Sequence, residues 1–311
     1  MSARAAATIW REGGLRGLTK TASAAIRAEA PLLVGRRRTA ASVGAYYDLV
    51  TDASRQFYGD NFHFGYFETG GETLQGAHDA HTDLVARLAQ LGEGQRVLDV
   101  GCGLGAPAVR MARNHGCQVV GINISREQIR QGRAMVAEQG MSDRVQIQHA
   151  DARELPFGDG SFDAVVCVEV AGDICVAPGD KDKLVSEMFR VLKPGGGVGF
   201  SDLALHTPAT RADRRVLRAI FYDDGSQLVT DWPAVFTERG FTVGEHHCIL
   251  EQTMPTWECV RSLIGDDEGE LAKRYGAGVA RRTAAQIERL PAILARIAAF
   301  PVLAAEKPRG S

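Results

Sequence analysis

The chain has 311 residues, of which 45% are hydrophobic and 24% are charged. These proportions are those of an ordinary soluble globular protein, and the length suits one large domain or one domain with a cap. The net charge of −2 argues against a nucleic-acid partner. No apolar run reaches the ~18 residues that a membrane span requires.

The six cysteines include no C-x-x-C pair and no spacing typical of metal ligands. Several lie within apolar runs, which favours buried, reduced thiols in a cytoplasmic protein. Residues 1–42 are rich in Ala, Arg, Ser and Gly. That composition is typical of an organelle transit peptide and equally of a poorly ordered extension. We expect the extension to precede a single domain over residues 43–311.

Residues 43–95 begin with a stretch dense in aromatic side chains, followed by helical spacing of apolar residues over 74–91. Some of the rings would pack a helix onto the core, and the others would line an apolar substrate pocket. The pocket candidates are Tyr46, Tyr47, Phe57, Tyr58, His63, Phe64 and Tyr66. We interpret His78 and His81 as surface residues of the helix, because no third metal ligand is evident nearby.

From residue 96 onward, short apolar runs alternate with helical patterns. The expected strands are 96–100, 117–122, 144–149, 162–169 and 197–203, and the expected helices are 106–115, 125–139 and 180–192. Ser125 is a suitable N-cap for the second of these helices. This alternation predicts a parallel sheet with right-handed crossovers.

The first of these strands runs directly into a glycine loop, Gly101-Cys102-Gly103-Leu104-Gly105, and then into a helix. This is the geometry of nucleotide sites in open α/β sheets, where glycines allow a tight turn and a close ligand. With Ala106 the loop also satisfies the dinucleotide pattern G-x-G-x-x-G/A. A dinucleotide site, however, has an acidic residue about 20 positions further on, where this chain has Asn123.

Three further segments, 149–157, 161–169 and 189–196, follow in order along the chain. With the glycine loop, they resemble the S-adenosylmethionine-dependent methyltransferases of the Rossmann-like class. The resemblance is closest to the branch of sterol, tocopherol, prenyl-diphosphate and natural-product methyltransferases, and it covers residues 43–205.

The resemblance implies an α/β fold: a Rossmann-like, seven-stranded, mostly parallel sheet with helices on both faces. Its sixth strand would be 241–249, and an antiparallel seventh would be 301–306. The cofactor-binding core would then span 96–250, a helical cap 251–300, and the last strand with a tail 301–311. The cap would either cover the pocket or form a contact in a homo-oligomer.

The resemblance also implies S-adenosylmethionine as cofactor and assigns residues to it. Asp99 would accept from its ammonium group, Asp151 from its adenine amino group, and Ala152 would offer a backbone amide. Asn123 stands where most relatives carry an acid against the ribose, so Ser125 and Gln128 would share that task. The full expected set is Asp99, Gly101, Gly103, Gly105, Asn123, Ser125, Gln128, Asp151 and Ala152.

Glu169 ends the fourth strand, at the edge of the sheet where ligands bind in such folds. Many relatives have Glu-Ser-x-x-His here; this chain lacks the histidine, and Asp173 is the nearest acidic alternative. A glutamate in apolar surroundings has a raised pKa and suits removal of a proton from a carbocation that aromatic rings shield. The leading hypothesis is therefore C-methylation of an isoprenoid, with Glu169 as base. O- or N-methylation of a phenol, sugar or polyketide is the alternative, and a non-catalytic cofactor-binding protein is a third.

A prenyl diphosphate substrate would require arginine or lysine donors together with Mg²⁺, because no D-D-x-x-D motif is present. Asp223-Asp224 is the nearest imitation of that motif, although a solvated turn explains the pair equally well. The two aromatic residues before it, Phe221 and Tyr222, complete the expected substrate pocket.

Overall fold

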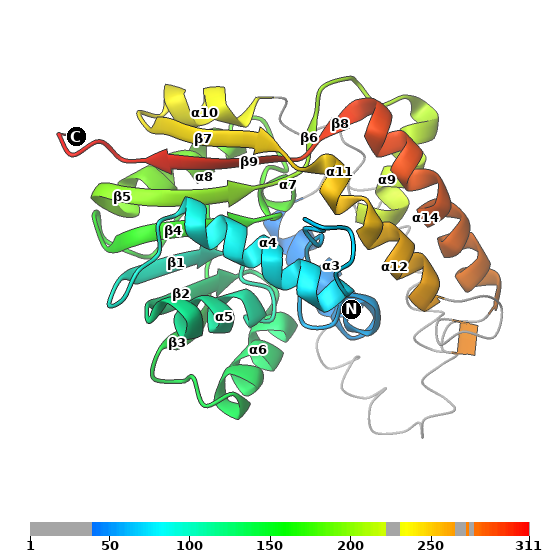
Figure 1. Ribbon diagram of the computed structural model, residues 1–311, viewed down its shortest axis with the longest axis horizontal. Helices are drawn as coiled ribbons and strands as arrows, with labels where there is room; N and C mark the ends of the chain where they lie inside the picture. The colour runs from blue at the N-terminus through cyan, green and yellow to red at the C-terminus, as the bar shows by residue number, and fades with distance from the viewer. Residues whose placement is uncertain (1–38, 222–230, 265–271, 274–276, 311) are drawn as a thin grey trace.

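The computed structural model describes residues 39–221, 231–264, 272–273 and 277–310 (Figure 1). Tyr222, the Asp223-Asp224 pair and most of the N-terminal extension lie outside the described residues. The side chain of Phe57 is also outside the description, so its predicted place in the pocket stays a prediction.

The centre of the fold is a seven-stranded sheet in the order β3-β2-β1-β4-β5-β9-β7. Its strands are β1 Arg96–Val100, β2 Gln118–Asn123, β3 Val145–His149, β4 Phe162–Val168, β5 Leu192–Ser201, β7 Thr242–Cys248 and β9 Pro301–Glu306. Strand β9 runs antiparallel to both of its neighbours, and the other pairs are parallel. The predicted Rossmann-like sheet is thus confirmed. A second sheet of β6 (Ala204–Leu205) and β8 (Ala298–Ala299) was not predicted.

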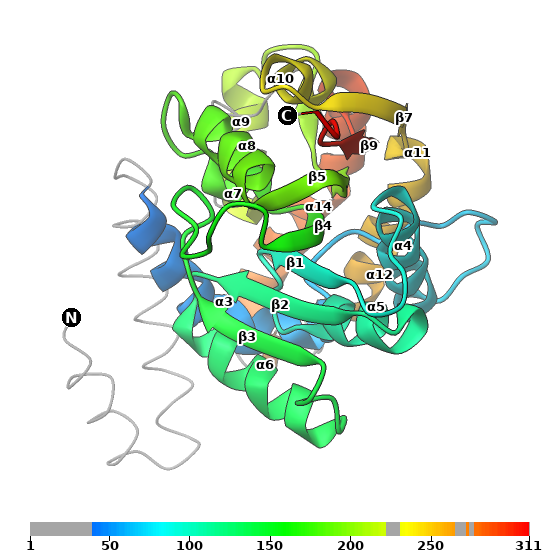
Figure 2. The same ribbon diagram turned by 90° about the vertical axis from the view of Figure 1, so that its left-hand side faces the viewer.

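Helices cover both faces of this sheet (Figure 2). On one face lie α4 (Leu74–Leu88), α5 (Ala106–His115) and α6 (Arg126–Glu138), and on the other lie α8 (Asp180–Val191) and α10 (Trp232–Glu238). Successive side chains of a strand point to opposite faces. Val97 therefore packs in one apolar cluster with Met111 of α5, while Leu98 packs in another with Met188 of α8.

The remaining helices gather at the carboxyl ends of the parallel strands (Figure 1). They are α3 (Ala40–Tyr58), α7 (Ala171–Ile174), α9 (Arg211–Phe221), α11 (Leu250–Thr253), α12 (Pro255–Ile264) and α14 (Ala277–Ile297). Helix α9, which falls in the predicted core region, packs with α14 in a third apolar cluster. Arg296 of α14 also pairs with the buried Asp213 of α9 at 2.6 Å. None of the described helices combines the length and apolarity needed to cross a membrane.

Helix α4 lies so close to β5 that one glycine of the strand has no room for a side chain. A Cβ atom at Gly199 would lie 2.1 Å from the carbonyl oxygen of Val85. We expect Gly199→Ala to lower the free energy of unfolding by about 1–3 kcal/mol, measured by urea denaturation. The control is Gly244→Ala in β7, where the nearest atom would lie 3.9 Å away. Equal losses in the two variants would contradict this account of the packing.

Candidate active site

Two adjoining cavities lie at the carboxyl ends of the parallel strands. One, which we call the loop cavity, is bordered by the glycine loop and by residues at the ends of β2 and β3. The other, the aromatic cavity, is bordered mainly by α3, residues 62–64 and α9. Both cavities are lined by Tyr47, Phe62, Glu169 and Asp173. These four residues, which we call the shared wall, therefore lie where the two cavities adjoin. Groups bound in the two cavities could approach each other there.

The three glycines of the loop have different structural roles. Gly101, Gly103 and Gly105 all have positive φ angles, of 73°, 55° and 84°. A Cβ atom would lie 2.2 Å from Val170 at Gly101 and 2.6 Å from Ile147 at Gly105, but at Gly103 it would meet no described atom within 4 Å. Gly101 and Gly103 line the loop cavity, whereas Gly105 does not. Gly103 is thus the position where backbone is open to a ligand, and Gly105 serves packing.

Asn123 uses both of its amide N–H donors, and one hydrogen bond to its Oδ1, within the protein itself. Its Nδ2 donates to Gln128 Oε1 at 2.7 Å and to the carbonyl of Gly103 at 3.2 Å, while its Oδ1 accepts from the backbone of Ser125 at 3.1 Å. Ser125 caps α6, as predicted, and donates to Asp48. Gln128 lines the loop cavity, and its Nε2 has no hydrogen-bond partner within the described part of the chain. Gln128 is therefore the better candidate for a ligand hydroxyl, with Asn123 and Ser125 holding the loop.

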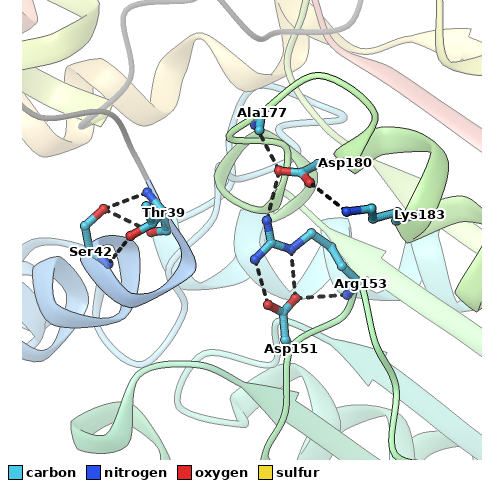
Figure 3. A network of polar contacts seen from close by, with 7 residues as sticks. All are labelled: Thr39, Ser42, Asp151, Arg153, Ala177, Asp180 and Lys183. Carbon is cyan, nitrogen blue, oxygen red and sulfur yellow. Dashed lines mark hydrogen bonds and ion pairs between the residues drawn. The ribbon is translucent and has the colours of Figure 1, made fainter.

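Asp151 enters the loop cavity as part of an ion-pair network (Figure 3). Arg153 donates to its carboxylate through Nε at 3.0 Å and Nη2 at 2.7 Å, and to Asp180 through Nη1 at 2.9 Å. Partial burial would raise the pKa of Asp151, but the hydrogen bonds and charge of Arg153 outweigh it and hold the pKa below its ordinary value. Asp151 is thus an ionised acceptor, and Ala152 lines the cavity beside it. Sequence reasoning missed Arg153 and Asp180.

Asp99 is buried at the end of β1, and its Oδ2 has no partner among the described residues. Desolvation raises its pKa to about 7. It does not line the loop cavity itself. A buried carboxyl in this state is suited to a cationic partner or to a water that bridges to one. Together with Gln128 and the open backbone at Gly103, this unsatisfied carboxyl fits S-adenosylmethionine, which carries an ammonium group and a ribose.

Glu169 follows β4 in the left-handed region, with φ of 52°. Its backbone donates to Ser201 at 2.8 Å, and its Oε1 accepts from the backbone N–H of Phe64 at 2.6 Å. Desolvation raises the pKa of Glu169 well above its ordinary value; the Phe64 hydrogen bond opposes this shift, and the nearby Asp202 adds to it. The carboxyl is thus largely desolvated, with the N–H of Phe64 and the acid Asp202 close to it.

Two further acids stand near Glu169. Asp173 accepts a hydrogen bond from the hydroxyl of Tyr47, which joins α7 to α3 across the shared wall. Asp202 lines the aromatic cavity and accepts from the backbone of Gly172 at 3.0 Å and of Leu203 at 2.7 Å. Its burial raises its pKa to about 7. Sequence reasoning missed Asp202, although an acid directly after the carboxyl end of β5 is the signal that singled out Glu169.

The aromatic cavity brings together most of the predicted pocket residues. Tyr46, Tyr47, Tyr58, His63, Phe64 and Phe221 line it, and Val50, Phe62, Leu203, Leu217 and Ile220 add further apolar surface. Tyr66 lines neither cavity; it packs against the apolar cluster of the cap, which corrects its assignment. The described lining of the aromatic cavity contains no arginine or lysine.

The two histidines of α4 are buried, with exposed fractions of 1% for His78 and 0% for His81, so their assignment to the surface was wrong. The reason is that α4 is covered by the segment around Phe64 as well as by the sheet. His63 and His81 both place Nδ1 against the carbonyl oxygen of Phe64, at 2.9 and 2.7 Å.

His63, His81 and Glu169 each have a potential metal-ligand atom, and these atoms lie within 4.8 Å of one another. A carbonyl oxygen can only accept, so both Nδ1 atoms must carry protons and cannot ligate a metal in this arrangement. Burial lowers the pKa of His63 to about 4 and that of His81 to about 3, which keeps both rings neutral. The Nδ1 atoms of both histidines thus belong to the hydrogen bonds of the Phe64 carbonyl, Nε2 of His81 contacts the hydroxyl of Ser201, and Nε2 of His63 has no partner among the described residues.

The fold and the loop cavity define a Rossmann-like protein with a cofactor site at its glycine loop. Residues 97–196 match the family model of the methyltransferase domain. Over 222 residues, the chain is 33% identical to the 27-O-demethylrifamycin SV methyltransferase of Amycolatopsis mediterranei, covering 69% of this chain and 79% of that one. The chain therefore belongs to the S-adenosylmethionine-dependent methyltransferases.

Two other proteins are similar to this chain over different shares of its length. The sterol 24-C-methyltransferase of Eremothecium gossypii is 39% identical over 155 residues, which is 50% of this chain but 40% of that enzyme. The solved structure of the [4+2]-cyclase SpnF superposes with a TM-score of 0.72 and 31% identity, covering 87% of this chain and 97% of that one. The core is thus shared among proteins whose names describe different reactions.

The open backbone at Gly103 leads to a test of the loop cavity. We expect Gly103→Val to abolish S-adenosylmethionine binding in calorimetry, because the side chain would occupy the space through which a ligand approaches. The matched control is Gly140→Val, since Gly140 also has a positive φ, of 66°, and open space around it but lies after α6, away from both cavities. Undiminished binding by a folded Gly103→Val protein would remove the loop from the site.

Proposed function

We propose that this methyltransferase acts on an uncharged, largely apolar small molecule held in the aromatic cavity, with Glu169 as the group that takes the proton. The observation that carries the proposal is the wall common to both cavities, formed by Tyr47, Phe62, Glu169 and Asp173. A cofactor in the loop cavity and a substrate in the aromatic cavity would face each other across this wall, beside a buried carboxyl of raised pKa.

The loop cavity would hold S-adenosylmethionine, which supplies an electrophilic methyl group. In this proposal Asp99 receives the ammonium group, Gln128 the ribose and Asp151 the adenine amino group. Gly101 and Gly103 allow the close approach, and Ala152 adds a backbone contact. Asn123, which also lines the cavity, holds the loop together with Ser125, and Gly105 serves packing. Catalysis by such a site would come mainly from positioning the two reactants and excluding water.

The charges of the aromatic cavity favour an uncharged substrate over a prenyl diphosphate. Its described lining has three acids, Glu169, Asp173 and Asp202, and no arginine or lysine. Diphosphate oxygens are normally held by cationic donors, and here they would face carboxyl groups instead. We therefore propose an isoprenoid or similar apolar metabolite without a diphosphate, and no Mg²⁺ requirement.

The geometry supports transfer to carbon in particular. The electrons of a substrate double bond would form the new C–CH₃ bond while the sulfur of the cofactor keeps the electrons of the bond that breaks. The resulting cation would be shielded by aromatic rings that line the cavity, such as those of Tyr46, Tyr58 and Phe64. Glu169 would then take a proton from the neighbouring carbon, and the C–H electrons would form a new double bond. A carboxylate with a raised pKa is well suited to this step.

O-methylation of a natural product is the second candidate, and the extent of the similarities favours it. The rifamycin O-methyltransferase matches over 222 residues, whereas the sterol enzyme matches over 155. The longer match covers 69% of this chain, against 50% for the sterol enzyme. In this reaction Glu169, or Asp173 through Tyr47, would take the proton of a substrate hydroxyl.

A panel of acceptors decides between carbon and oxygen. The protein would be incubated with methyl-labelled cofactor and with sterols, uncharged isoprenoids, their diphosphates, phenols and polyketide alcohols. We expect label on carbon of an uncharged isoprenoid, unaffected by chelator. Label on oxygen would establish the second candidate, and activity restricted to a diphosphate in the presence of Mg²⁺ would contradict the account of the cavity.

The role of Glu169 is tested on the acceptor that this panel identifies. Glu169→Gln keeps the shape of the side chain but has little basicity, so we expect product formation to fall by roughly 10²–10⁴-fold. Cofactor affinity, measured by calorimetry on the same variant, should stay close to that of the wild type. Near wild-type turnover at saturating cofactor would assign the proton to another group, and Asp173 would be the next candidate.

A further inference from the structure

We infer that His81 is a positioning residue for Glu169, acting through the backbone of Phe64. The contact runs in two steps: His81 holds the carbonyl of Phe64, and the N–H of the same residue donates to Glu169 Oε1. The geometric part of this inference stands alone, and its catalytic consequence rests on the proposed function of Glu169.

The protonation of His81 follows from its two partners. Its Nδ1 lies 2.7 Å from the carbonyl oxygen of Phe64, which can only accept, so Nδ1 carries the proton. Its Nε2, 3.0 Å from the hydroxyl of Ser201, must then accept from that hydroxyl. With 0% of the residue exposed, the ring has a single orientation that satisfies both nitrogens.

The peptide unit between Phe64 and Gly65 is fixed on both of its sides. Its carbonyl accepts from His81 and also from His63, while its N–H donates to the buried Oγ1 of Thr256 at 2.9 Å. A peptide held at both polar groups cannot rotate without breaking buried hydrogen bonds, which is costly. This holds the Cα atom of Phe64 in place, and the N–H of the preceding peptide unit, that of Phe64, donates to Glu169.

Ser201 links the side chain of His81 to the backbone of Glu169. Its hydroxyl contacts His81, and its carbonyl accepts from the backbone N–H of Glu169 at 2.8 Å. The backbone and the side chain of Glu169 are thus held by elements that His81 joins. Among the described residues, the carboxylate makes its contacts through Oε1, to Phe64 and, at 3.5 Å, to His81. This leaves Oε2 as the oxygen for a substrate proton.

The consequence that can be measured is the titration of Glu169. The N–H of Phe64 stabilises the ionised carboxylate, so loosening it should raise the pKa of Glu169 further. The other titratable groups around this carboxyl are Tyr58 from α3, His63 and His81, Asp202 after β5, and the Tyr47–Asp173 pair on the shared wall. None of these is altered in the control variant below.

The experiment is a pH titration of protein labelled with ¹³C at the glutamate carboxyl carbon, followed by NMR, with the Glu169 signal assigned by its absence in Glu169→Gln. It needs no substrate. We expect His81→Leu to raise the apparent pKa of Glu169 by roughly one, a tenfold change in its acid dissociation constant. His81→Asn, whose amide nitrogen can occupy the place of Nδ1, should restore most of the wild-type value.

The matched control is His78→Leu, on the same helix and equally buried, whose ring nitrogens have no hydrogen-bond partner among the described residues. It should leave the titration of Glu169 unchanged. If His81→Leu fails to fold, Thr256→Val tests the other side of the same peptide and should shift the pKa in the same direction. Unchanged titration in His81→Leu or Thr256→Val, or an equal shift in His78→Leu, would overturn the inference.

The two proposals about Glu169 can fail separately. Loss of turnover in Glu169→Gln without a shift of titration in the His81 variants would keep the base and remove the positioning role. A shift of titration in the His81 variants, with near wild-type turnover in Glu169→Gln, would keep the positioning role of His81 and remove Glu169 as the base. If both hold, His81→Leu should lower kcat by roughly 10- to 100-fold at neutral pH, with part of the loss recovered at higher pH.

Discussion

The near-complete removal of the Glu169 side chain from solvent, with 11% of it exposed, is the constraint on which the rest of the site depends. A carboxylate removed from water is unfavourable unless hydrogen bonds replace its hydration. Here the donor is the backbone of Phe64, 105 residues earlier in the chain. The N-terminal segment must therefore close over the sheet before the carboxyl has its partner. Residues 62–64 of this segment also line the aromatic cavity. The same segment therefore gives the acid its hydrogen bond and excludes water from the cavity.

The site is divided between a core and its surroundings. The loop cavity is built largely from the carboxyl ends of neighbouring parallel strands, which the topology of the sheet brings to one edge. The aromatic cavity is built mainly from α3, residues 62–64 and α9, outside that core. This division explains why methyltransferases with different acceptors can share the core, and why the acceptor has to be argued from the cavity itself.

The elements of the core could be predicted because their signals are local. Short apolar runs placed β1, β2 and β4 almost to the residue, and β5 begins earlier than predicted, at Leu192. Helix α9 was missed, because four arginines in eleven residues hide the apolar positions Val216 and Leu217 that it buries against α14. His81 was misplaced for the same kind of reason: its burial is decided by a segment that covers α4 from outside the helix.

The sequence by itself determined the fold class, the glycine loop and the identity of Glu169 and Asp151 as acids at strand ends, since each depends on spacing along one stretch of chain. Tertiary structure decided which polar side chains of the site keep a donor or acceptor available for a ligand. The amide N–H groups of Asn123 donate to Gln128 and Gly103, whereas Nε2 of Gln128 has no partner among the residues that the structure describes. Hydrogen bonds are saturable and directional, so what a side chain can offer a ligand depends on the partners that folding has already given it.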